Sequence, residues 1–217
     1  MIPQLPLRIL TGLLLATSLG AADDAYLGWD AKYASQVVLG RRVDGRVGPA
    51  LDFRVLSTDR SFNYKLRATW MTPEVIRASA RLQQFIRALS PAETRKLVAD
   101  AEAIEGTVVL VEIDPREGSG VIPRDWVSTF GPAGPAGSAP LFVRGVEKPE
   151  LRELPALAGG ARRDYAYEVF WVVFPSKNDE GKLLFGPADK EAELSIRIHD
   201  KLGKVRWPVT DALPVKR

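Results

Sequence analysis

The chain has 217 residues, 46% of them hydrophobic, and its 30 basic and 27 acidic residues give a formal net charge of +3. Such a composition can build a hydrophobic core, and the near-balanced charge, without a basic run, argues against nucleic acid as a partner. The chain has no cysteine and a single histidine, His199. Disulfides and a cysteine nucleophile are therefore excluded, and zinc or copper sites lack the ligands they need.

The first twenty residues have the pattern of an export signal. Arg8 precedes an apolar run over residues 9–16, and small residues at positions 18, 20 and 22 fit a cleavage site. An uncleaved anchor or a buried helix is the alternative, but the run is too short to span a bilayer, and no later segment approaches a span. We therefore predict a signal peptide over residues 1–20, one globular domain over residues 21–217, and a periplasmic or secreted protein. The lack of cysteines favours a bacterial source.

The first predicted elements of the domain are two strands, around residues 51–56 and over residues 61–70, and we expect them to pair. The second alternates apolar and polar residues, which is typical of an antiparallel strand with one solvated face. Its apolar face consists of Phe62, Tyr64, Leu66, Ala68 and Trp70. Its polar face consists of Ser61, Asn63, Lys65, Arg67 and Thr69.

A helical hairpin is predicted next, over about residues 72–105. Thr72 can cap a first helix that begins at Pro73, and Ser90 with Glu93 forms a capping box for a second helix. Gly106 is placed to end the second helix. Helical spacing predicts the buried faces: Val75, Ile76, Leu82, Phe85, Ile86 and Leu89 in the first helix, and Leu97, Val98, Ala101 and Ile104 in the second.

The rest of the chain is predicted to form strands and short connections. Residues 107–114 and 164–175 are apolar on both faces, so both strands belong in the interior of a sheet. We expect the first of them to emerge into solvent after Glu112. Residues 131–140 read as a mobile Gly/Pro/Ala loop, and residues 139–146 as a short strand.

Two glycine turns are predicted near the end of the chain. Gly181 and Gly203 each follow a polar run that suits a turn with a left-handed glycine. The second turn joins strands over residues 192–199 and 204–209. In the first of these strands we expect Glu193, Ser195, Arg197 and His199 to face the solvent. Together the patterns predict an α+β fold that is mainly β: an antiparallel β-sandwich-like domain with the two-helix hairpin inserted at about residues 72–105.

His199 is the only candidate base for a Ser-His-Asp triad, and its neighbours do not suit that role. Asp200 points to the opposite face of a regular strand, and Ser195 lies four residues away, about 13 Å at the strand rise. We interpret His199 as an exposed residue of a polar sheet face. No Gly-x-Gly-x-x-Gly or P-loop motif occurs in the sequence, and we predict no cofactor.

The segment VEIDPREGSGVIPRDW, residues 111–126, holds four carboxylates around a Gly-Ser-Gly turn. Paired carboxylates can serve in general acid and base catalysis, so Glu112, Asp114 and Asp125 are the catalytic candidates. The metal candidates are Asp114 and Glu117, although basic and glycine residues stand where the EF-hand pattern needs ligands. A purely structural turn is the third interpretation, and its Glu117, Ser119 and Trp126 could form a partner or ligand surface.

Aromatic residues in the strands can line either a ligand groove or the core, and their alternation favours the core. These residues are Trp126, Tyr165, Tyr167, Trp171 and Trp207. With so few catalytic residue types, we expect a non-catalytic binding or assembly module of the bacterial cell envelope, whose partner is a protein or another envelope component. Two alternatives stay open: a carboxylate-dependent hydrolase of cell-wall or carbohydrate substrates, and a small-ligand or calcium-binding protein.

Overall fold

The computed structural model of the chain describes residues 24–51, 61–115, 122–134, 141–159 and 167–209. Its helices are η1 (Ala25–Gly28), α1 (Ala31–Gly40), α2 (Pro73–Arg87), α3 (Pro91–Glu102), η2 (Pro149–Glu153) and η3 (Pro155–Leu157). Its strands are β1 (Arg42–Val47), β2 (Tyr64–Trp70), β3 (Thr107–Asp114), β4 (Val127–Pro132), β5 (Val143–Arg144), β6 (Val146–Glu147), β7 (Glu168–Phe174), β8 (Glu191–Ile198) and β9 (Lys201–Pro208). None of the helices in these ranges has the length and hydropathy needed to cross a membrane.

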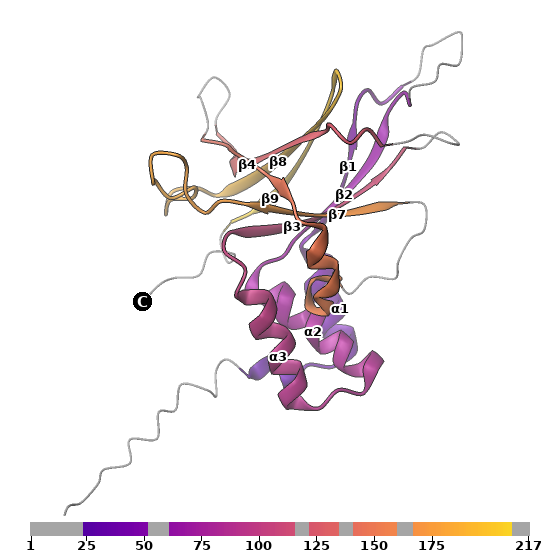
Figure 1. Cartoon of the computed structure of the whole chain (residues 1–217), viewed down its shortest axis with the longest axis vertical. Helices are drawn as coiled ribbons and strands as arrows, with labels where there is room; N and C mark the ends of the chain where they lie inside the picture. Colours follow the sequence, from indigo (N-terminus) through magenta and orange to yellow (C-terminus); the bar gives the residue numbers. More distant parts are fainter. Residues whose placement is uncertain (1–23, 52–60, 116–121, 135–140, 160–166, 210–217) are drawn as a thin grey trace, which may run out of the picture.

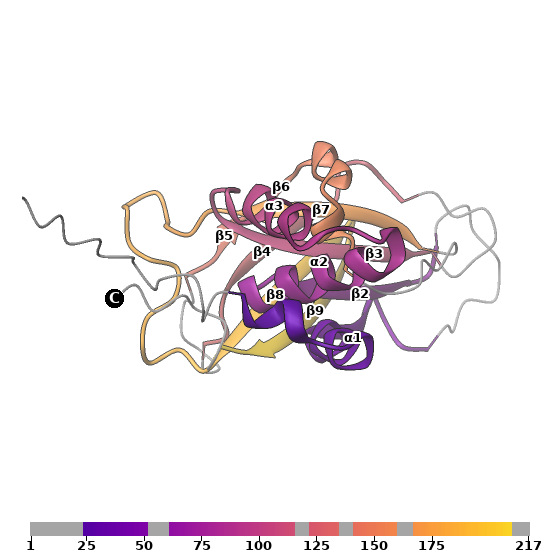
Figure 2. The ribbon, with the colours of Figure 1, turned by 90° about the horizontal axis from the view of Figure 1, so that it is seen from below.

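The strands form two antiparallel sheets. The five-stranded sheet has the order β1-β2-β3-β7-β6, and the four-stranded sheet has the order β5-β4-β8-β9. The helices pack on the outer face of the five-stranded sheet, so the molecule has three layers: helices, five-stranded sheet and four-stranded sheet (Figures 1 and 2). The predicted α+β, mainly β fold with a helical hairpin is confirmed, and a sandwich describes the two sheets well.

Each pair of neighbouring layers encloses its own hydrophobic core. Between the sheets, the fully buried Phe130 ring lies at the centre of a group of aromatic side chains. Its ring centroid lies within 6.2 Å of those of Trp70, Phe174, Phe185 and Trp207. The second core lies under the helices and includes Val75, Val98 and Leu110. Strand β3 supplies side chains to both cores, which is why its sequence is apolar on both faces.

At both lateral edges the two sheets come into close contact at glycine residues. At one edge β1 crosses β9, where a side chain at Gly203 would collide with the carbonyl oxygen of Arg46, and one at Gly45 would come within 2.6 Å of Val205. At the other edge Gly145 separates β5 of one sheet from β6 of the other, with Phe174, Ser128 and Val172 each 2.5 Å from its absent Cβ. Only glycine permits these close approaches of backbone.

The predicted starts of the two helices and the first glycine turn are confirmed. The Thr72 hydroxyl accepts a hydrogen bond from the Val75 amide, and Ser90 and Glu93 form a complete capping box. Gly181 has a φ of 78° at its turn, but Gly106 does not end the second helix: α3 ends at Glu102 with Ala103 as its C-cap, and Gly106, with a φ of 108°, directly precedes β3. The interior position of β3 and β7 and the inward face of β2 are as predicted.

The segment before β2 differs from the prediction. The strand expected around residues 51–56 falls almost entirely outside the described residues. The strand that pairs with β2 is β1, preceded by helix α1, and neither was predicted. Both are short, and β1 has two arginines, an aspartate and a glycine among its six residues, so its alternation of apolar residues is weak.

Burial on polar faces also differs from the prediction. Ser61, Asn63 and Thr69 were expected to be solvated, but all three are buried because neighbouring segments cover their face of β2. The Asn63 amide, for example, donates to the carbonyl of Pro49. Conversely, Phe85 and Ile86 were expected to be buried in the helical hairpin and are instead exposed at the end of α2.

Three connections were also predicted wrongly. Gly131 and Pro132 belong to β4 rather than to a loop, whose remaining residues 135–140 lie outside the described residues. The segment after them forms two strands, one in each sheet, because the chain crosses between sheets at Gly145. The β8–β9 turn is made by His199 and Asp200, with a φ of 53° at His199, and Gly203 lies within β9.

Candidate functional site

The predicted catalytic carboxylates Glu112 and Asp114 lie at the end of β3, on the part of the sheet face that continues beyond the helices. Their side chains are only 12% and 11% exposed, so the end of this strand does not emerge into solvent as expected. Asp114 forms an ion pair of 2.8 Å with Lys65, and Glu112 lies 3.7 Å from the guanidinium of Arg67. Both cations come from the neighbouring strand β2, which faces β3 in antiparallel register.

Arg67 lies at the centre of this group of charged side chains, which we call the charged lattice. Its Nε atom donates to Asp44 of β1 at 3.0 Å, and its guanidinium lies 4.3 Å from the centroid of the Tyr167 ring. Burial opposes the charged form of Arg67, but the hydrogen bond to Asp44 and the charge of Glu112 outweigh it and raise the pKa of Arg67. Burial also raises the pKa of Tyr167, against the effect of Arg67 and Lys65, so the phenol stays neutral at physiological pH.

The other residues of the predicted site are not brought together with these two. Asp125 is exposed in a turn, while Glu117 and Ser119 lie outside the described residues. Trp126 is half-buried and packs edge-on against Phe170 at a centroid distance of 5.2 Å, as part of the margin of the inter-sheet core. Among the residues that the structure describes, no three acidic or histidine side chains are grouped closely enough to hold a metal ion.

The remaining aromatic candidates are structural. The indole nitrogen of Trp207 donates to the carbonyl of Arg41 at 2.8 Å, and that of Trp171 donates to Leu157 at 3.0 Å. Both rings belong to the two cores, and Tyr165 lies outside the described residues. His199 is exposed in its turn, and the Ser195 hydroxyl donates to Glu193 at 3.3 Å. No Ser-His-Asp arrangement follows from these positions.

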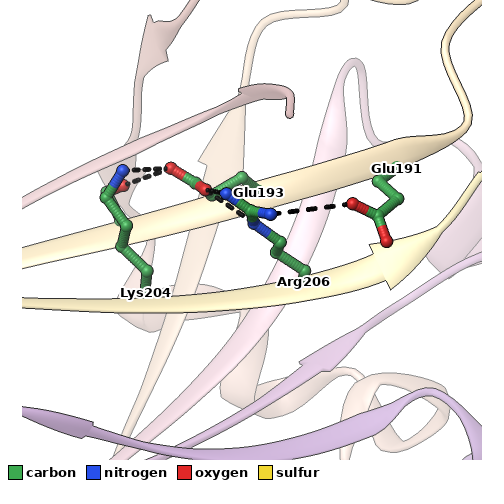
Figure 3. Close-up of polar contacts among 5 residues, drawn as sticks. Glu191, Glu193, Lys204 and Arg206 are labelled. Carbon is green, nitrogen blue, oxygen red and sulfur yellow. Dashed lines mark hydrogen bonds and ion pairs between the residues drawn. The ribbon is translucent and has the colours of Figure 1, made fainter. Parts of the chain in front are cut away.

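A second charged group, not predicted from the sequence, lies on the outer face of the four-stranded sheet. Glu193 of β8 was expected to face solvent, but it is only 2% exposed. Figure 3 shows its carboxylate between Lys204 and Arg206 of β9, at 2.7 Å from each cation. Arg206 also approaches Glu191 at 3.8 Å.

Burial of Glu193 follows from its neighbours in the sheet. Gly131 of β4 lies directly beside it, and the Phe142 ring would be 2.9 Å from a Cβ at Gly131. The missing side chain thus lets the segment before β5 lie close over this part of the sheet. Burial alone would raise the pKa of Glu193, but hydrogen bonds from Lys204 and Arg206 outweigh it and hold that pKa below its ordinary value.

The same face of the sheet carries further basic side chains. Arg144 of β5 and Arg197 of β8 alternate with buried residues, so both point outward with Lys204 and Arg206. In the described part of the chain, neither Arg144 nor Arg197 has an ion-pair partner. We define Arg144, Arg197, Lys204 and Arg206 as the basic face. Thr129 and Ser195 lie between Arg144 and Lys204 in register across the sheet, so polar hydroxyls separate the cations.

A signal for the basic face was present in the sequence. Acidic residues alternate with apolar ones before the β8–β9 turn, and basic residues alternate with apolar ones after it. With the turn at His199 and Asp200, Glu193 is directly opposite Arg206. Placing the turn at Gly203 shifted this register and hid the pairing. The burial of Glu193 also depends on β4, whose pairing with β8 has no local signature, and on the segment before β5.

The chain matches no protein-family model, no curated protein and no solved structure. Function therefore has to be argued from the geometry of the two charged groups.

Proposed function

We propose that the protein is an exported, non-catalytic binding module of the bacterial cell envelope, and that the basic face is where it binds an acidic partner. The observation that carries the proposal is the Glu193 group. A carboxylate that is 2% exposed holds Lys204 and Arg206, which are themselves about half exposed, in fixed positions on an open sheet face. Preorganised charges lose little conformational entropy when a partner binds.

The charge of the face favours an acidic partner. Four outward cations lie across strands β5, β8 and β9, against one buried and one exposed carboxylate, Glu193 and Glu191. Neighbouring strands are about 4.8 Å apart, so these cations span roughly three strand spacings. Such an array is suited to several acidic groups at once, and electrostatic attraction would guide the encounter.

The surroundings of Glu112 and Asp114 argue against a catalytic role for these two carboxylates in hydrolysis. A general acid has to keep its proton at working pH, and adjacent cations oppose that. Each of these carboxylates has a cation of β2 within ion-pair distance. The arrangement resembles a cross-strand lattice that stabilises the sheet, and we assign it that role.

The test is crosslinking of the tagged protein in its native envelope, comparing the wild type with an Arg144→Glu/Arg197→Glu variant. The matched control is Arg152→Glu/Lys177→Glu, which makes the same change of net charge at exposed positions away from the basic face. We expect one recurrent, acidic partner that the control retains and the face variant loses, and weaker capture at high salt. Equal capture by all three proteins would contradict the proposal, as would the absence of a recurrent partner.

A further inference from the structure

A patch of exposed hydrophobic side chains lies on the helical layer, away from the basic face. Tyr33 of α1 and Phe85 and Ile86 of α2 are 45%, 47% and 73% exposed. Arg81 joins the patch together: its Nε atom donates to the carbonyl of Trp29 at 2.8 Å, and its guanidinium lies 4.1 Å from the Phe85 ring centroid.

Trp29 completes this group. Its ring meets that of Tyr33 edge-on at 5.1 Å. We define Trp29, Tyr33, Arg81, Phe85 and Ile86 as the aromatic tip. Large apolar residues that cluster on a surface mark an interaction site far more often than isolated ones do.

The aromatic tip lies at the end of the helical layer that is remote from the sheets. Helix α1 ends beside the sheet, where the Trp70 amide donates to the carbonyl of Arg41, and α2 begins at Pro73 directly after β2. The other ends of both helices therefore point away from the sandwich, as Figure 1 shows.

Cations outnumber carboxylates at the aromatic tip. Besides Arg81, the neighbouring Lys32 and Arg87 are exposed, and in the described part of the chain neither has an ion-pair partner. The nearby carboxylates Asp30 and Glu93 accept backbone N–H groups as helix caps, so three cations lie among two carboxylates. An exposed apolar patch with a small excess of cations fits an acidic lipid surface.

The path of the chain agrees with this orientation. The described residues begin at Asp24, which is held against α3 by an ion pair of 2.9 Å with Arg95. The apolar run at residues 9–16 thus joins the domain through its helical layer and not through the sandwich.

We propose that the aromatic tip docks the protein on a membrane surface with acidic headgroups, inserting Phe85 and Ile86 into the interfacial region. Aromatic rings settle at this depth, and partly buried apolar side chains with adjacent cations give reversible binding. The site is separate from the basic face, so the inference stands or falls independently of the proposed function.

The test is flotation of the exported protein with vesicles of phosphatidylcholine alone or of phosphatidylcholine and phosphatidylglycerol in equal parts. The variant is Phe85→Ser/Ile86→Ser, and the matched control is Leu183→Ser/Leu202→Ser, two exposed leucines of the sandwich. We expect binding to the acidic vesicles to fall about tenfold or more in the tip variant and to persist in the control. Any binding through residues 1–20 would persist in both variants, so only a loss specific to the tip supports the proposal.

Four outcomes would overturn it: no binding of the wild type, equal binding to neutral vesicles, equal loss in both variants, or conversion of a dimer to a monomer by the tip substitutions without any effect on vesicles. The last outcome would identify the tip as a self-association surface. The Arg144→Glu/Arg197→Glu variant should still bind the acidic vesicles, which separates a failure of the tip from a failure of the basic face.

Discussion

The outer faces of the two sheets contain similar charged residues, but they bury different charges. On the five-stranded sheet charges of both signs are buried: the side chains of Arg67, Glu112 and Asp114 are 14%, 12% and 11% exposed, and the exposed partners are Asp44 at 74% and Lys65 at 46%. On the four-stranded sheet only a carboxylate of the ion-pair group is buried: the side chain of Glu193 is 3% exposed, against 50% for Lys204 and 54% for Arg206.

The difference shows how an ion-pair network can determine what a sheet face presents. A buried charge needs partners, and those partners are held at the surface around it. On the first face the exposed partners have both signs, Asp44 and Lys65, and around Glu193 the exposed partners are basic. The helices also cover part of the first face, and none of them lies on the second (Figure 1). We therefore assign binding to the second face and stabilisation of the sheet to the lattice on the first.

The largest effect is expected from a substitution at the edge where β1 crosses β9 and the two sheets meet. A Gly203→Ala substitution places a Cβ against the Arg46 carbonyl where β1 crosses β9, so one strand has to move. We expect the free energy of unfolding to fall by about 3 kcal/mol, measured by chemical denaturation. Gly40→Ala is the control, because nothing lies within 4 Å of its added Cβ, and it should change stability by less than about 0.5 kcal/mol. A neutral Gly203→Ala would mean that the strands are not in close contact.

Replacing the buried carboxylate tests the second face directly. Glu193→Gln keeps the shape of the side chain but removes the counter-charge of Lys204 and leaves Arg206 only the exposed Glu191 at 3.8 Å. We expect a loss of about 2 kcal/mol in unfolding free energy. Glu191→Gln, on the same strand but 54% exposed, should cost less than about 0.5 kcal/mol. If both variants lose the same amount, burial of Glu193 does not organise the face.

Replacing the buried cation is the corresponding test of the first face. Arg67→Met keeps much of the apolar stem but removes the partner of Asp44 and Glu112 and the contact with Tyr167. We expect a loss of about 1.5 kcal/mol, measured in the same denaturation assay. Asp44→Asn should be close to neutral, because exposed ion pairs contribute little. An Asp44→Asn loss as large as that of Arg67→Met would contradict the assignment of Arg67 as the buried member of this pair.

The smallest effect is a pH dependence that comes from Glu193. Its pKa is lowered in the folded protein, because hydrogen bonds from Lys204 and Arg206 outweigh the opposing effect of burial. A carboxylate of this kind contributes stability above its unfolded pKa of about 4.3 and loses it as pH falls through the lower folded value. Stability measured between neutral pH and about pH 3 should therefore fall less steeply in Glu193→Gln than in the wild type. Parallel curves would show that Glu193 is not held in its charged form.

The candidate site was predictable only in part. Glu112 and Asp114 could be placed on one face of a strand from the alternation of β3, but their partners Lys65 and Arg67 were expected on a solvated face. The two sets meet because β2 and β3 pair across the whole helical hairpin. Glu193 was placed on the right face, but its burial depends on Gly131 and Phe142, more than fifty residues earlier in the chain.

The sequence by itself determined the elements whose signals are local. Alternating residues predicted β2, β3, β7, β8 and β9, while Thr72, Ser90 and Glu93 predicted the starts of the two helices. Only the tertiary structure decided which polar residues are buried and which apolar ones are exposed. The physical reason is that periodicity describes the two sides of one segment, whereas solvent access depends on which distant segments cover each side. Glu193, covered by the segment before β5, and Ile86, at an uncovered helix end, are the two clearest cases.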